Sequence, residues 1–276
     1  MTTLANGDLA SGSYDDTIKI WDAEKRKLKS TLIGHEMGVI SLKQLKNGDL
    51  ASASWDKTVR IWNITNGQIK RNLTAHTADV ISLALLKNGN LASGSMDKTI
   101  NVWNTTDGSL IKTLNACNIS IWSIIELNNG NLLAGANNGT LCVLDIDKNM
   151  LNRSIAGHSN GVYALTFLEN GDLVTGSHDK TIKIWNSFDF SVKRVLTGHT
   201  DRIFAFVLLQ NGHLVSASAD RTIKIWNVND WTVKKTLKGH TDIVHALTVL
   251  QNGNLVSGAL DNIIKIWEIN DIIGTK

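Results

Sequence analysis

Histidine, serine and aspartate, the residue types of a hydrolytic triad, recur along the chain at a fixed spacing. In one set, Ser52 lies 17 residues after His35, and Asp56 lies four residues after Ser52. Such residues could supply a nucleophile, a base and an orienting carboxylate. Four more sets share the spacing, with threonine for serine in one of them: His76, Ser93 and Asp97; His158, Thr175 and Asp179; His199, Ser216 and Asp220; His240, Ser257 and Asp261.

A tryptophan six residues after each aspartate argues against catalysis by these sets. The indole has only an N–H donor to offer, an enzyme needs one triad rather than five, and the sets fall in segments that are predicted to pack as strands. We therefore expect no catalytic residue, and a protein that is not an enzyme. The tryptophans are Trp62, Trp103, Trp185, Trp226 and Trp267.

The sets belong to a 41-residue repeat that occurs seven times, marked by Asn-Gly pairs that begin at Asn6, Asn47, Asn88, Asn129, Asn170, Asn211 and Asn252. One copy, residues 38–73, contains the segments GVISLKQL, DLASAS, TVRIWN and QIKRNL. Their length and their Val, Ile, Leu, Thr and Ser content predict four antiparallel strands. Asn47-Gly48 predicts a type I′ hairpin between the first two, because both residues tolerate positive φ.

Stacked sheets of this kind can close into a ring that leaves only short edges. The segments TIKIWD, TVRIWN, TINVWN, TIKIWN and TIKIWE, with upstream Gly-His pairs such as Gly34-His35, resemble WD repeats over essentially the whole chain. The resemblance implies an all-β fold, a seven-bladed β-propeller of four-stranded blades in a single domain, residues 1–276.

The chain is slightly shorter than seven full copies of 41 residues, so we expect incomplete first and last blades. Two explanations stay open at this point. The chain is part of a longer array, or the ring closes without the usual exchange of strands between its first and last blades.

In WD repeats the four recurring positions form a structural network, which the resemblance implies here too: indole to hydroxyl, hydroxyl to imidazole, imidazole to carboxylate. The fourth copy has Cys117, Ala134, Asn138 and Leu144 at these positions. The whole set has been exchanged there, as expected if a half-kept network is worse than none. The first copy has no histidine and keeps Ser11, Asp15 and Trp21.

Strand direction places the histidine loops and the aspartate turns at the same end of each blade, the top. The residue before each turn aspartate, and the residues three and five after each loop histidine, should line this face. In the resembling family these positions commonly contact ligands. Five of the ten aromatic residues outside the networks fall here, and interface cores favour such side chains. The candidates are Tyr14, Trp55, Met96, Trp122, Tyr163, His178, Arg202, Phe204, Ile243, His245 and Leu260.

Other interpretations of these residues stay open. Trp122 and Tyr163 could instead plug the channel or pack against a neighbouring blade, and Phe204 could join Phe206 in the core. His178 and His245 lack a third ligand at a recognisable spacing, so no metal site is predicted. Phosphate recognition normally uses several arginines, and only Arg202 lies among the candidates, although Lys57, Lys98, Lys180 and Arg221 follow turn aspartates.

Composition points to a soluble globular chain. There is no apolar run of membrane-spanning length, and 28 basic against 25 acidic residues do not predict nucleic-acid binding. Nothing indicates a cofactor or a small-molecule substrate. The N-terminus lacks a secretory signal, and two cysteines are too few for a disulfide framework. We expect a cytoplasmic or nuclear protein.

Taken with the resemblance, these patterns favour a non-catalytic scaffold or adaptor that binds partner proteins or peptides on the top face. The alternative is a substrate-recognition or regulatory domain of a larger protein, such as a ubiquitin ligase or a kinase-linked protein. A propeller enzyme would need an acid, base or metal cluster in the channel, and none is found. Fold alone does not identify the partner.

Overall fold

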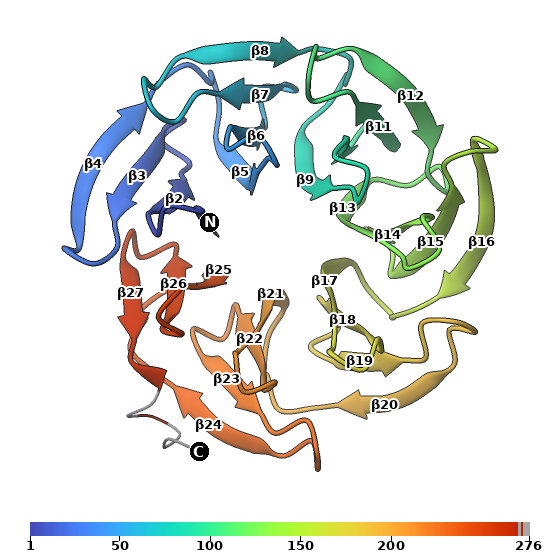
Figure 1. Cartoon of the computed structure of the whole chain (residues 1–276). Helices are drawn as coiled ribbons and strands as arrows, with labels where there is room; N and C mark the ends of the chain where they lie inside the picture. Colours follow the sequence, from blue (N-terminus) through green and yellow to red (C-terminus); the bar gives the residue numbers. More distant parts are fainter. Residues whose placement is uncertain (270–271, 273–276) are drawn as a thin grey trace. The chain divides into compact units, whose positions relative to one another are not determined.

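The computed structural model describes residues 1–269 and residue 272, and they form antiparallel sheets with almost no helix. The chain divides into two compact units, residues 1–157 and 158–276. Four blades lie in the first unit and three in the second (Figure 1). The predicted fold class, an all-β seven-bladed β-propeller, is confirmed, while the prediction of a single domain stays a prediction.

The first unit holds strands β1 to β16. Their bounds are β1 Thr2–Thr3, β2 Leu9–Gly12, β3 Ile18–Asp22, β4 Lys27–Leu32, β5 Val39–Gln44, β6 Leu50–Ser54, β7 Val59–Trp62, β8 Ile69–Leu73, β9 Val80–Leu85, β10 Leu91–Ser95, β11 Thr99–Trp103, β12 Leu110–Asn115, β13 Ile121–Glu126, β14 Leu132–Ala136, β15 Thr140–Asp145 and β16 Met150–Ala156. Each blade takes four consecutive strands in chain order. The first blade begins with β1, which has only two residues.

The second unit holds strands β17 to β27. Their bounds are β17 Val162–Phe167, β18 Leu173–Ser177, β19 Ile182–Trp185, β20 Val192–Leu196, β21 Ile203–Leu208, β22 Leu214–Ser218, β23 Ile223–Trp226, β24 Val233–Leu237, β25 Val244–Val249, β26 Leu255–Ala259 and β27 Ile264–Trp267. The last blade has three strands among the described residues.

The position of a strand within its blade sets its burial. Every residue of β6 is buried, whereas in the fourth strand, β8, only Leu73 is buried. Within a unit, blades share cores: Ile61 of one blade packs in one cluster with Leu83 and Leu91 of the next. The first strands of neighbouring blades contact one another, as β5 and β9 do. Inner strands such as β6 are therefore buried on both faces, whereas the outermost strand of a blade is mostly exposed.

A β-bulge interrupts the first strand of six blades near its top end. In β21 the pairing with β22 passes from Ile203 directly to Ala205, so Phe204 is the extra residue. The same shift leaves Ile40, Ile81, Trp122, Tyr163 and His245 as extra residues in the corresponding strands. A bulge redirects the side chain of its extra residue. Each of these is the residue five after a loop histidine, or after Cys117 in the fourth blade.

The predicted type I′ hairpin at Asn47-Gly48 is wrong. Gly48 has a φ of 86°, but Asn47 is not among the residues with positive φ. Gly48 N donates to Leu45 O at 3.0 Å, and Leu45 N donates to Asp49 O at 2.8 Å. The connection therefore has three residues, with glycine in the left-handed conformation at its end. The Asn47 carboxamide accepts the Asp49 N–H at 3.1 Å instead of occupying a left-handed turn position.

Candidate functional site

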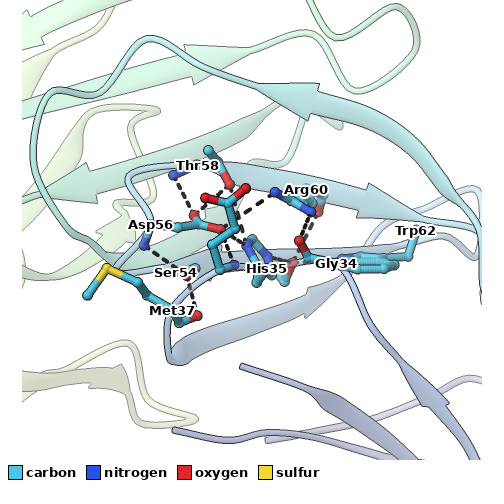
Figure 2. A network of polar contacts seen from close by, with 10 residues as sticks. Gly34, His35, Met37, Ser54, Asp56, Thr58, Arg60 and Trp62 are labelled. Carbon is cyan, nitrogen blue, oxygen red and sulfur yellow. Dashed lines mark hydrogen bonds and ion pairs between the residues drawn. The ribbon is translucent and has the colours of Figure 1, made fainter. Parts of the chain in front are cut away.

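The structure brings the four recurring residues of the second blade together in one buried chain of hydrogen bonds (Figure 2). Trp62 Nε1 donates to Ser52 Oγ at 2.7 Å, and Ser52 Oγ lies 2.6 Å from His35 Nε2. His35 Nδ1 lies 2.6 Å from Asp56 Oδ2. With a neutral imidazole, Nδ1–H donates to the carboxylate, and Nε2 accepts the serine proton. The network links the loop before β5 to β6, β7 and the turn between them.

The environment favours this protonation pattern. Burial lowers the pKa of His35 below its ordinary value, which keeps the imidazole neutral. Burial alone would raise the pKa of Asp56, but hydrogen bonds from Thr58 and His35 outweigh it and hold that pKa below its ordinary value. Arg60 donates to Gly34 O and so ties β7 to the same loop. Figure 2 shows these groups converging on Asp56 and Gly34.

The other four predicted networks have the same geometry. Each imidazole Nε2 lies 2.6–2.7 Å from its hydroxyl, and each Nδ1 lies 2.7–2.9 Å from its carboxylate. Each indole donates to the hydroxyl at 2.8–2.9 Å. The five hydroxyl residues are fully buried at 0% exposure, so no substrate reaches these oxygens in this structure. The four-residue sets are His76, Ser93, Asp97 and Trp103; His158, Thr175, Asp179 and Trp185; His199, Ser216, Asp220 and Trp226; His240, Ser257, Asp261 and Trp267.

A second serine, two residues after the network hydroxyl, also holds the top loops, and sequence reasoning missed it. Ser54 Oγ donates to Met37 O at 2.7 Å and accepts the Asp56 N–H at 3.0 Å. It therefore joins the histidine loop to the aspartate turn. The recurrence of this serine two residues before the turn aspartate was the available signal. The equivalent residues are Ser95, Ser177 and Ser218.

Backbone pairing joins two of the three predicted top positions. Trp55 N donates to Gly38 O at 3.1 Å, so the residue before the turn aspartate pairs with the residue three after the histidine. His178 with Gly161, and Leu260 with Ile243, repeat this contact at 2.9 Å. In these blades, a backbone hydrogen bond therefore fixes the aspartate turn against the histidine loop at the top of the blade.

In the first unit, the aromatic candidates make close contacts with each other or with polar groups. Tyr14 and Trp55 stack with ring centroids 4.7 Å apart. Trp122 Nε1 donates to Asn137 Oδ1 at 2.8 Å, and both residues belong to the fourth blade. The Met96 carbonyl accepts the Ser120 hydroxyl at 3.1 Å, with Met96 itself half-buried. We call Tyr14, Trp55, Met96 and Trp122 the unit-1 surface.

In the second unit, bulge residues from three blades form a continuous row of rings. Phe204 lies between Tyr163, at a centroid distance of 5.1 Å, and His245, at 4.1 Å. His178 lies 6.0 Å from Tyr163, and the Arg202 guanidinium lies 5.6 Å from the Phe204 ring centre. The rings are half-buried. We call Tyr163, His178, Arg202, Phe204, Ile243, His245 and Leu260 the unit-2 surface.

The bulge separates Phe204 from Phe206, two residues that a regular strand would point to the same side. Phe206 packs against the buried cluster that contains Ile203 and Leu214, whereas Phe204 stacks on His245. Only Phe206 contributes to that core cluster.

Charged and titratable groups on the unit-2 surface are engaged by neighbours. Arg202 Nε lies 3.6 Å from Asp201 Oδ1. Burial and the Arg202 charge lower the pKa of His245 to about 4, so this imidazole is neutral. Among the described residues, no group of three or more His, Cys, Asp or Glu side chains could hold a metal ion. No described helix is long and apolar enough to cross a membrane.

The fourth blade departs from the others, as its residues predicted, and adds a contact that was not foreseen. Ala134 and Leu144 are fully buried, and the Asn138 side chain accepts the Thr140 N–H at 3.1 Å. Cys117 and Cys142 form a disulfide with a Cα separation of 6.2 Å. Both cysteines lie in the fourth copy of the repeat, and this shared position was the sequence feature that could have predicted the disulfide. In the first blade, Trp21 donates to Ser11 at 2.8 Å.

Comparison with family models agrees with this geometry. The model described as WD domain, G-beta repeat matches residues 3–22, 26–63, 67–104, 149–186, 190–227 and 231–268. The matches omit residues 105–148, where the fourth blade has lost its network. No curated protein matches the chain. Six matched repeats cover most of the sequence, and the chain belongs to the WD40 family.

Proposed function

We propose that this protein is a non-catalytic scaffold that binds partner proteins through the top loops of its blades. WD40 propellers are typically protein-interaction scaffolds, and the five triad-like sets have no accessible hydroxyl. We expect the partner segment to carry apolar or aromatic side chains. The unit-1 and unit-2 surfaces consist mainly of aromatic and apolar residues, and Arg202 is the arginine among them.

The row of Tyr163, Phe204 and His245 supports this proposal most directly. Three neighbouring blades each turn a ring out of the regular strand at a bulge. Rings that are held by one another lose little conformational freedom on binding, which favours them as anchors of an interface. Arg202 beside Phe204 adds a hydrogen-bond donor at the edge of the row.

The test compares partner capture by three forms of the full chain: wild type, Tyr163→Ala with Phe204→Ala, and Phe188→Ala. Phe188 is the matched control, because it is 93% exposed and lies in the turn between β19 and β20, outside the unit-2 surface. We expect proteins retained by wild type and Phe188→Ala to be lost from the double variant. Equal retention by all three forms, with unchanged circular dichroism, would reject the unit-2 surface as the binding site.

A further inference from the structure

The two cysteines of the fourth blade occupy the two positions whose side chains hold the loop in the second blade. Cys117 stands where five repeats have a histidine, and Cys142 of β15 stands where the second blade has Arg60. Arg60 and His35 both fasten the loop before β5. In the fourth blade, the Cys117–Cys142 bond joins the loop after β12 to β15 in their place.

The loop has two consecutive residues in the left-handed region of backbone conformation. Cys117 has a φ of 50° and Asn118 a φ of 56°, both in the left-handed region. Residues with a Cβ atom seldom adopt this region, and they stay there when the surroundings impose it. No network histidine has a positive φ. The disulfide supplies a covalent constraint at the first of these two residues.

The constrained loop leads directly into the candidate binding surface. Asn137 N donates to Ser120 O at 3.0 Å, and the Asn137 side chain accepts the Trp122 indole N–H at 2.8 Å. The loop of residues 116–120 therefore contacts Asn137, the residue that accepts the Trp122 indole N–H. A change in this loop would be transmitted to Trp122 through Ser120 and Asn137.

We propose that Cys117 and Cys142 form a reversible, redox-controlled staple: as a disulfide it replaces the polar network of the fourth blade, and as a dithiol it releases the loop before β13. Cys117 is half-buried, whereas Cys142 is fully buried. Glutathione disulfide is a suitable oxidant. The Cys117 thiolate attacks one glutathione sulfur and releases the first glutathione, and the Cys142 thiolate then attacks Cys117 and releases the second. The two protons lost by the cysteines leave on the two reduced glutathiones.

Hydrogen exchange on the full chain tests the staple, after oxidation with glutathione disulfide and after reduction with dithiothreitol. Alkylation of the denatured protein counts the free thiols in each sample. We expect no free thiols and slow exchange at residues 116–122 in the oxidised form. The reduced form should have two free thiols and exchange on the order of tenfold faster there. The loop that contains His199 should not respond, since its network holds no sulfur.

Two results would overturn the staple: two free thiols after oxidation, or equal exchange of residues 116–122 in the two verified redox states. Cys142→Ala serves as a second check: glutathione disulfide can then form only a mixed disulfide on Cys117, which joins no second strand, so residues 116–122 should exchange as fast as in the reduced wild type under both conditions. Any redox effect on partner capture rests on the proposed function and would be measured separately. If Trp122→Ala captures partners as well as wild type does, Trp122 is not part of the binding site. The proposed staple is still supported if hydrogen exchange at residues 116–122 changes with redox state.

Discussion

Phe204 stacks on His245 with ring centroids 4.1 Å apart and an interplanar angle of 21°, although the two residues lie on the first strands of different blades. Both are the extra residues of β-bulges. A bulge releases one residue from the strand alternation, so each blade can present a ring without removing an apolar residue from its core. The same local irregularity, repeated in neighbouring blades, builds the row.

Phe204 and Phe206 are predicted to have separable roles. Phe206→Ala should lower the free energy of unfolding by about 3 kcal/mol, because it removes a ring packed against a buried cluster. Phe204→Ala should cost less than about 1.5 kcal/mol in stability and should weaken partner binding on the order of tenfold or more. Urea unfolding and partner titration measure the two quantities. Equal stability losses would show that Phe204 is also core.

Much of this architecture is encoded at the level of the repeat. The 41-residue spacing of Asn-Gly pairs and tryptophans predicts the blades, because strand-forming segments and turn residues recur together. The networks follow from the same register. They were predicted as sets because His35, Ser52, Asp56 and Trp62 recur as a unit and are lost as a unit in the fourth blade.

Features that depend on local hydrogen bonding could not be predicted in the same way. Asn47-Gly48 suggested a two-residue turn, but the pairing of Leu45 with Asp49 sets a three-residue connection. The bulges leave no mark in the apolar pattern, because the separation of Phe204 from Phe206 depends on how β21 pairs with β22. The contact between the two cysteines depends on the path of a loop with two left-handed residues.

Ser52→Ala and Ser11→Ala should differ in cost, although each removes the acceptor of an indole N–H. Ser52 also contacts His35, and its partner Trp62 is fully buried, so its loss leaves two groups unsatisfied. We expect a loss of about 2–3 kcal/mol for Ser52→Ala. Ser11 has no histidine partner, and Trp21 is partly exposed, so we expect about 1 kcal/mol or less. Urea denaturation compares them, and equal costs would contradict the network as a cooperative unit.

Gly38→Ala should disturb the stack of Tyr14 on Trp55. A Cβ atom at Gly38 would lie 3.0 Å from the Trp55 ring and 3.3 Å from the Tyr14 ring, so at least one ring must move by a few tenths of an ångström. We expect a changed near-ultraviolet circular dichroism signal from the ring pair, with the far-ultraviolet spectrum preserved. Trp55→Ala provides the reference spectrum for loss of the pair. An unaltered near-ultraviolet spectrum would mean that the rings accept the methyl group without shifting.

Stability should fall as the pH is lowered through the range in which unfolded histidine becomes protonated. Burial holds the pKa values of His35 and His76 below the ordinary value of 6.5, so the unfolded chain binds protons that the folded chain excludes. This contribution to stability is fully present above pH 6.5 and is lost as the pH falls toward the folded pKa values. His245, whose pKa is lowered to about 4, acts in the same direction.

The measurement is urea unfolding of the wild type and of His35→Gln between pH 7.5 and pH 5. The aspartate partners titrate below this window, because the pKa values of Asp56 and Asp97 are lowered from 3.8. Burial also lowers the pKa of the Met1 amino group from 8.0 to about 6, which acts in the same direction in the upper part of this window. The comparison with His35→Gln isolates the contribution of His35. We expect His35→Gln to be less stable at pH 7.5 and to lose less of its remaining stability on acidification. A wild type whose free energy of unfolding is constant or rises between pH 7 and pH 5 would show that these imidazoles are protonated in the folded protein.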